Sequence, residues 1–193
     1  MIKFQKETFD EKQQLLTFAK SGRCRVALYI GEETAIEATP AEDGGETKER
    51  TVYAYNVGWL EADGKITSES EALAALKAMK TADIDRHDTS PAVNSFTMDG
   101  IEMWLPKDTR VGLMNSLSIE KKAGKESSTL WFGSESFELS INYAMTMLSK
   151  LELYALECYN VTASHKADVA ELTSVEEVVA YDYESGYPDK LNF

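Results

Sequence analysis

The 193-residue sequence is poor in cysteine and in positive charge. Its two cysteines, Cys24 and Cys158, are too few for a disulfide framework, and both lie in apolar stretches where a reduced thiol packs as a small hydrophobic side chain. Twenty lysines and arginines stand against 33 aspartates and glutamates, and the resulting net charge of −13 argues against binding to nucleic acid, because phosphates would be repelled. The densest basic group, Lys121, Lys122 and Lys125, flanks a glycine in a polar turn and indicates a solvated loop.

Long apolar runs are also missing. No stretch approaches the roughly 20 residues that a bilayer-spanning helix requires. The first residues, MIKFQKETFDEK, contain no apolar segment of signal-peptide length. These absences predict a soluble protein without membrane insertion, kept in a cytoplasm or carried by a particle assembled there.

Motifs of catalysis are absent as well. The sequence has no Gly-rich phosphate loop, no Cys-x-x-Cys, no His-Glu-x-x-His and no Gly-x-Ser-x-Gly. One carboxylate–histidine cluster is present, at Asp83, Asp85, His87 and Asp88, but neither a helix nor a strand brings all four side chains together at these spacings. We therefore expect no enzyme activity, no catalytic residues, no cofactor and no metal site.

What the sequence does contain is an apolar fraction of 43%, typical of a folded protein, and one dominant helical pattern. Apolar residues follow one another in steps of three and four from residue 141 to 161, at Ile141, Met145, Leu148, Leu151, Ala155, Cys158 and Val161. This pattern predicts a long core helix over about 141–163, capped by Ser140. His165 then follows near the helix C-terminus, where a cation is favourable.

The rest of the second half predicts hairpins and shorter helices. Asp99–Gly100, between apolar runs over 96–105, is the strongest hairpin signal in the chain. A helix is expected from Pro106 to about 123, and a second hairpin over 127–139 turns at Gly133–Ser134. Thr173 or Ser174 is expected to cap a last helix over 175–181.

The first half predicts a small sheet with two helices. A strand over 2–5 leads to a helix that Thr8 caps and that ends at Ser21–Gly22. A hairpin follows, from a strand over 23–30 to one over 34–39, and then a loop over 40–50. Residues 51–61 form a strong strand, and a helix is expected from Thr67 or Ser68 to about residue 82.

These elements predict an α+β protein of two small units, each with antiparallel β-hairpins packed on helices. The first unit covers residues 1–85 and the second covers 96–193, dominated by the long core helix. Residues 86–95, part of the polar segment 83–94 that contains Pro91, are expected to form the linker.

The region over 96–193 also carries a recognisable pattern. It combines Trp104–Leu105 before a helix, the strand TLWFG at 129–133, the Leu- and Tyr-rich core helix, His165, and the tail YDYESGYP at 181–188. This pattern, which covers about half of the chain, resembles an uncharacterised domain family that is common in bacteriophages and prophages. There the family often forms the C-terminal part of small tail-associated, tail-fibre-assembly-like proteins. The resemblance implies a phage protein and carries over no catalytic residue.

The preferred interpretation is a non-enzymatic phage structural protein that is tail- or virion-associated. It would act through contacts with other phage structural proteins or with copies of itself, and it would be located in a virion assembled in the host cytoplasm. The expected interface lies on the hairpins and tail of the second unit, at Trp131, Phe132, Tyr181, Tyr183 and Tyr187. Removing Tyr183–Phe193 is then expected to impair assembly and leave the chain folded.

Two alternatives stay open. One is a tail-fibre assembly chaperone that works in the host cytoplasm and is absent from the finished particle. The other is a binding module for a glycan or small ligand, with Tyr53, Tyr55, Trp59 or Trp131 as stacking platforms. Exposure of two of these rings on one face would favour the binding module.

Overall fold

The structure is a computed structural model that describes residues 2–18, 25–39, 48–62 and 64–193. It contains helices and antiparallel strands, which confirms the predicted α+β class. The chain forms two compact units, Met1–Ala82 with Val169–Tyr181 and Asp83–Asp168 with Asp182–Phe193. The chain passes between the units at three points: inside α1 (Glu69–Asp88), inside α3 (Ile141–Glu171) and after Tyr181. Each unit therefore combines an earlier segment of the sequence with a later one.

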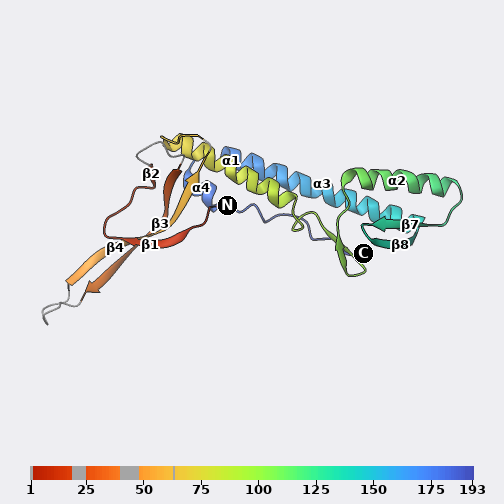
Figure 1. The fold of residues 1–193 in the computed structure, drawn as a ribbon, viewed down its shortest axis with the longest axis horizontal. Coiled ribbons are helices and arrows are strands. Elements are labelled where there is room, and N and C mark those ends of the chain that lie inside the picture. The colour runs from red at the N-terminus through yellow and green to blue at the C-terminus, as the bar shows by residue number, and fades with distance from the viewer. Residues whose placement is uncertain (1, 19–24, 40–47, 63) are drawn as a thin grey trace. The chain divides into compact units, whose positions relative to one another are not determined.

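A four-stranded antiparallel sheet forms the body of the first unit (Figure 1). Its strands are β1 (Gln5–Phe9), β2 (Leu16–Phe18), β3 (Arg25–Thr39) and β4 (Lys48–Glu61), in the spatial order β1-β4-β3-β2. The core joins buried side chains of the sheet, of α1 and of helix α4 (Val175–Ala180), among them Val26, Leu28, Leu60, Leu76, Val175 and Val178.

The predicted helix that begins at Thr8 is wrong in its described part, because Thr8 lies in β1 and residues 16–18 form β2. The first strand, expected over 2–5, instead spans Gln5–Phe9 as β1. Pairing with β4 satisfies the backbone groups of β1, and the Phe9 ring contacts the rings of Tyr29 and Tyr55 at centroid distances of 5.6 and 6.1 Å. The spacing of a capping box is a local signal, and here pairing with a sequence-distant strand outweighs it.

The predicted hairpin between residues 23–30 and 34–39 is also wrong, because the described residues of both segments belong to the single strand β3. Gly31, with a φ of 71°, lies where the register against β4 shifts between Ile30 and Glu33. The glycine therefore forms a bulge within the strand instead of a turn. The strand predicted over 51–61 is confirmed within β4. Cys24 and most of the predicted loop, residues 40–47, lie outside the described residues.

Helix α1 begins where the sequence predicts. The carboxylate of Glu71 accepts hydrogen bonds from the backbone N–H groups of Thr67 and Ser68, at 2.7 and 3.2 Å, and these bonds lower the pKa of Glu71. The helix continues past the expected end near residue 82 and reaches Asp88, within the segment expected as a linker. Ile84 is fully buried, so this part of the helix has an apolar anchor that the polar composition of the segment concealed.

In the second unit both predicted hairpins are present. The first consists of β5 (Phe96–Met98) and β6 (Ile101–Met103), and its turn residues Asp99 and Gly100 have φ values of 48° and 81°. Two positive φ angles are the requirement of the type I′ turn that Asp-Gly favours. The second hairpin consists of β7 (Ser127–Phe132) and β8 (Glu135–Ser140).

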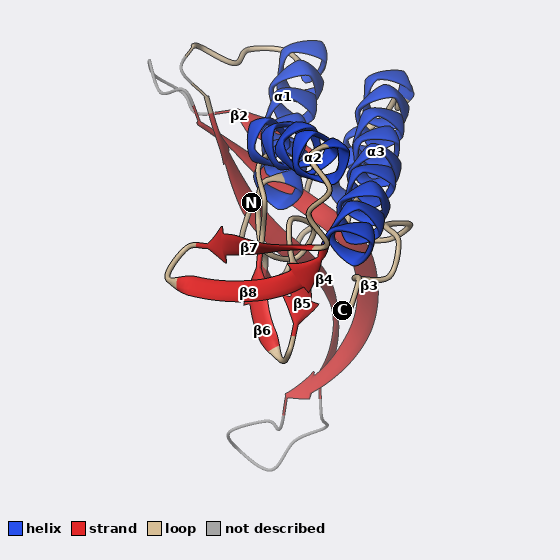
Figure 2. Ribbon diagram, turned by 90° about the vertical axis from the view of Figure 1, so that its right-hand side faces the viewer, coloured by secondary structure: helices blue, strands red, loops and turns tan. Residues whose placement is uncertain are grey.

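Helices α2 (Lys107–Lys122) and α3 pack on these hairpins (Figures 1 and 2). The α3 residues at the predicted core positions Ile141, Leu148 and Leu151 are buried, and they share one core with the following residues: Phe96, Met98, Leu105, Leu117, Leu130, Phe132, Ala144 and Met147. The hydroxyl of Ser140 accepts the backbone N–H of Tyr143 at 3.3 Å, which confirms the predicted cap.

Helix α3 is longer than predicted and ends at Glu171, because no proline or glycine interrupts residues 141–171. His165 therefore lies inside the helix and not at its C-terminus, and its Nε2 is 3.0 Å from the carbonyl oxygen of Ser185. Helix α4 has the predicted cap: Ser174 and Glu177 form a capping box. None of the helices in the described residues is long and apolar enough to cross a membrane.

The C-terminal residues belong to the packing of the second unit. The N–H of Phe193 donates to the carbonyl of Thr97 at 2.9 Å, and the N–H of Thr97 donates to the carbonyl of Leu191 at 2.9 Å. The Phe193 ring meets the buried Phe96 ring at 5.8 Å. This segment therefore extends the β5–β6 hairpin and covers its apolar core.

Candidate functional site

Two neighbouring cavities lie between α2 and α3 in the second unit. The first, which we call the apolar cavity, has a volume of about 420 Å³ and is lined by Arg110, Val111, Met114, Asn115, Ser118, Leu148 and Glu152. The second, the polar cavity, measures about 340 Å³ and is lined by Asp88, Asn94, Lys107, Arg110, Glu152, Ala155, Leu156, Cys158 and Tyr159. Arg110 and Glu152 belong to both walls, so they mark where the two cavities adjoin.

Arg110 is the most unusual residue of this site, because its side chain is only 6% exposed. Its Nε donates to Oε2 of Glu152 at 2.8 Å, and its Nη1 donates to the carbonyl oxygen of Leu105 at 2.6 Å. The guanidinium also lies over the Trp104 ring, 5.2 Å from the ring centroid. Burying an arginine costs free energy of desolvation unless the guanidinium is paired. The partners of Arg110 come from α3 and from the residues just before α2.

The start of α2 explains how Arg110 reaches this position. Pro106 is the N-cap of the helix, with a φ of −55°, and no side chain caps the first turn. Lys107 and Arg110 are three residues apart, so both side chains project from the same side of the helix into the wall of the polar cavity. Arg110 also stands one turn before Leu113 and Met114, on the side of α2 that packs against the core.

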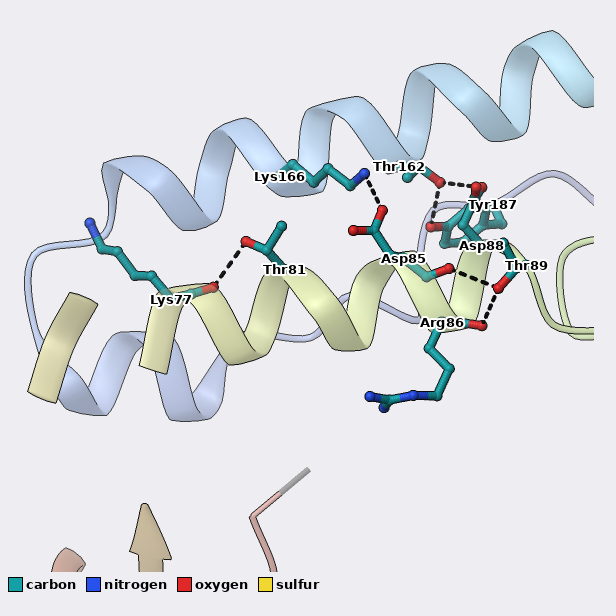
Figure 3. A network of polar contacts seen from close by, with 9 residues as sticks. All are labelled: Lys77, Thr81, Asp85, Arg86, Asp88, Thr89, Thr162, Lys166 and Tyr187. Carbon is teal, nitrogen blue, oxygen red and sulfur yellow. Dashed lines mark hydrogen bonds and ion pairs between the residues drawn. The ribbon is translucent and has the colours of Figure 1, made fainter. Parts of the chain in front are cut away.

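One residue of the polar-cavity wall, Asp88, belongs to a polar network (Figure 3). The Thr162 hydroxyl is 2.7 Å from Oδ1 of Asp88 and 2.9 Å from the Tyr187 hydroxyl, and Asp85 forms an ion pair with Lys166. These contacts join α1, α3 and the C-terminal segment within the second unit. They fix the Asp88 carboxylate while leaving its second oxygen without a partner among the described residues.

The potential nucleophile in the cavity wall is not activated. Burial raises the pKa of the Cys158 thiol and also raises the pKa of the adjacent Tyr154 phenol. A thiol with a raised pKa stays protonated near neutrality, whereas nucleophilic cysteines need the thiolate. The walls of the two cavities thus combine charged side chains with apolar ones.

The carboxylate–histidine cluster singled out in the sequence is dispersed into separate contacts. Asp83 pairs with Arg86, Asp85 with Lys166, and the His87 ring lies between the Tyr183 and Tyr187 rings, at centroid distances of 5.8 and 5.2 Å. Among the described residues no group of three histidine, cysteine, aspartate or glutamate side chains is arranged to hold a metal ion.

The five residues predicted to form an interface differ widely in exposure. Trp131 is 64% exposed, whereas Phe132 and Tyr183 are buried at 5% and 7%. Tyr181 and Tyr187 are partly buried, and Tyr181 belongs to the first unit. The structure therefore does not bring these residues into one surface. Phe132 and Tyr183 contribute to packing in the second unit, and Trp131 is the only one of the five that is mostly exposed.

The predicted stacking platform is similarly divided. Tyr55 is buried, and its hydroxyl donates to Glu32 at 3.0 Å; Tyr53 is partly buried. Trp59 is 46% exposed and carries the guanidinium of Arg25 over its ring at 4.2 Å. Of the four rings, only Trp59 and Trp131 are exposed, and they belong to different units, so neither unit carries two exposed rings of this set.

Sequence reasoning missed Arg110. A usable signal was present, because Arg110, Met114 and Leu117 follow one another at steps of four and three along the apolar side of the predicted helix. A charged residue in such a row must be paired, exposed by helix fraying or part of a site. What the sequence did not show was the partner, Glu152, which comes from the exposed side of the core helix.

Exposed apolar side chains surround the cavities. Leu156 and Tyr159, which line the polar cavity, are 53% and 66% exposed, and Val111 at the apolar cavity is 56% exposed. Large apolar residues so exposed, next to a cavity, are typical of a surface that contacts another molecule. Comparison of the chain with protein-family models, with curated protein sequences and with solved structures returned no match.

Proposed function

We propose that this chain is a non-enzymatic bacteriophage structural protein, a tail- or virion-associated component that acts through protein–protein contacts. The observation that carries the proposal is the apolar surface around the α2–α3 cavities, where Val111, Leu156 and Tyr159 are each more than half exposed. Trp131, on the β7–β8 hairpin of the same unit, is exposed to a similar degree. Contact with a partner chain would remove this apolar area from water.

Charge and sequence pattern support the same proposal. A net charge of −13 disfavours a role in binding phage nucleic acid directly and favours protein partners, which are other phage structural proteins or copies of the chain. The pattern over residues 96–193 that resembles the phage domain family includes Trp104, whose ring lies beneath the Arg110 guanidinium, and the exposed Trp131. The proposed location is the virion, assembled in the host cytoplasm.

The test is quantitative mass spectrometry of purified particles from the phage or prophage that encodes the chain. The quantity to measure is the molar ratio of this chain to the major capsid protein. A fixed ratio that survives repeated purification is expected for a virion component, and its value indicates the symmetry of the location. Absence from particles combined with abundance in infected cells would overturn the virion assignment in favour of a cytoplasmic assembly chaperone.

A further inference from the structure

The Arg110 guanidinium has more hydrogen-bonding capacity than the chain uses. A guanidinium carries five N–H donors in one plane. One donates to Glu152 and one to the carbonyl of Leu105, and no other acceptor among the described residues contacts the remaining three. No Arg110 nitrogen is fully enclosed without a partner, so the spare donors open onto the cavities that Arg110 lines. Spare donors on a buried guanidinium match a planar carboxylate, which can accept two of them.

Lys107 adds a second cation to the same wall. Its side chain is exposed and forms no ion pair with any described residue, although the chain as a whole has a large excess of carboxylates. The first turn of α2 has no side-chain cap, so its backbone N–H groups add partial positive charge beside Lys107. An anionic group placed between Lys107 and Arg110 would accept the spare Arg110 N–H donors and pair with Lys107.

The opposite wall limits which anion fits. Asp88 and Glu152 face the same polar cavity, Asp88 held by Thr162 and Glu152 by Arg110. The Asp88 carboxylate has one oxygen without a partner among the described residues, so it disfavours a ligand group that carries only negative charge and favours one that also carries an N–H donor. A carboxylate that stands beside its own backbone N–H, as at the end of a polypeptide, can place the negative oxygens at Arg110 and direct the N–H toward Asp88. The charges of the cavity therefore favour a peptide carboxy-terminus.

The apolar cavity supplies the rest of the recognition. It adjoins the polar cavity at Arg110 and Glu152, and Val111, Met114 and Leu148 form its apolar lining. Its volume of about 420 Å³ lies in the range of pockets that bind small ligands. Apolar side chains that precede a bound carboxylate would enter it and be removed from water.

We infer that the paired cavities bind the apolar carboxy-terminal segment of a partner polypeptide, with its terminal carboxylate at Arg110 and Lys107 and its apolar side chains in the apolar cavity. The identity of the partner as a phage structural protein rests on the proposed function, whereas the recognition chemistry rests on the cavities alone.

The experiment titrates the full chain with N-acetyl-leucyl-leucine and, as a matched control ligand, with its carboxy-terminal amide. The methyl signal of Met114 is followed by NMR in protein with labelled methionine methyl groups and is assigned with Met114→Leu. We expect the acid to bind with a Kd of about 1–5 mM, as suits so small a ligand, and the amide to bind about fivefold more weakly or worse, since it loses the charge-assisted hydrogen bonds.

Variants make the assignment specific. Arg110 is buried and its replacement can unfold the unit, so the test uses the exposed Lys107 instead. Lys107→Gln is expected to weaken binding of the acid about fivefold and leave the amide unchanged. Lys150→Gln, on the exposed side of α3 and outside both cavities, is the matched control and is expected to change neither.

Three results would overturn the inference. The first is a Met114 signal that does not move up to about 20 mM acid, which excludes even weak affinity. The second is equal affinity for the acid and the amide. The third is an unchanged affinity of Lys107→Gln for the acid. These results are separable from the particle measurement. Acid-selective binding that depends on Lys107 supports the cavity assignment even if the chain is absent from particles, and a chain present in particles without such binding refutes the cavity assignment alone.

Discussion

The substitution Tyr183→Ala tests whether the C-terminal segment is a structural part of the second unit or a free interface. The sequence placed Tyr183 and Trp131 together as interface aromatics. The structure separates them, with Tyr183 at 7% exposure against the His87 ring and Trp131 at 64% exposure on β7. Replacing each by alanine therefore gives a matched pair that differs in burial.

The expected loss of stability follows from the buried area. An aromatic side chain buries about 200 Å², which at about 25 cal/mol per Å² corresponds to about 5 kcal/mol. Alanine retains part of this area at its Cβ, so Tyr183→Ala is expected to lower the free energy of unfolding by about 3–4 kcal/mol, within the range for large-to-small core substitutions. Trp131→Ala, which removes an already solvated ring, is expected to cost less than about 1 kcal/mol.

The assay is urea unfolding of the full-length variants followed by far-ultraviolet circular dichroism. With an m value of about 2 kcal/mol/M, Tyr183→Ala lowers the unfolding midpoint by about 1.5–2 M. A Tyr183→Ala midpoint within the error of the unsubstituted chain would refute the assignment of this residue to the core. An equally large effect of Trp131→Ala would show that exposure does not predict which of the two substitutions destabilises the chain more.

Three further predictions concern other parts of the chain. Tyr154→Phe leaves the carbonyl of Val93 without the hydroxyl that donates to it at 2.7 Å, and urea unfolding is expected to show a free energy of unfolding lower by about 1–3 kcal/mol. An unchanged free energy of unfolding would contradict this. The pKa of Glu177 lies below its ordinary value of 4.5 because backbone N–H groups donate to its carboxylate. The stabilisation that Glu177 contributes is therefore full above pH 4.5 and is lost as the pH falls through the lowered pKa. Glu177→Gln should flatten this part of the acid-unfolding curve, and parallel curves for the two proteins would contradict this. Gly58→Ala would place a Cβ 2.6 Å from Cγ2 of Ile2, and this crowding is expected to lower the free energy of unfolding by about 1–3 kcal/mol. Hydrogen exchange that leaves the sheet unchanged would contradict this expectation.

Local chemistry made part of the fold predictable. The Asp99–Gly100 turn, the Ser174 cap and the amphipathic pattern of α3 each depend on residues within a few positions of one another, and each is present in the structure. The α2–α3 cavities were not predictable in the same way. Arg110 stood in an apolar row of its helix, but its pairing with Glu152 joins positions 42 residues apart.

The errors have the same physical origin. Residues 8–18 have the spacing of a helix start but lie in or between edge strands, because β2 pairs with the following strand β3 and β1 pairs with β4, which is distant in sequence. Composition alone marked residues 83–88 as linker, whereas the burial of Ile84 keeps them in α1.

By itself, then, the sequence determined the α+β class, the Asp99–Gly100 turn, the Ser140 and Ser174 caps and the long core helix, because these follow from periodicity and short-range hydrogen bonding. Only the tertiary structure decided which aromatics are buried and which cations remain without a carboxylate, because burial and pairing depend on segments brought together from far along the chain. Tyr183 packs in the core, Trp131 remains exposed, and Lys107 and Arg110 face one cavity. The candidate site of this protein is therefore a product of its packing.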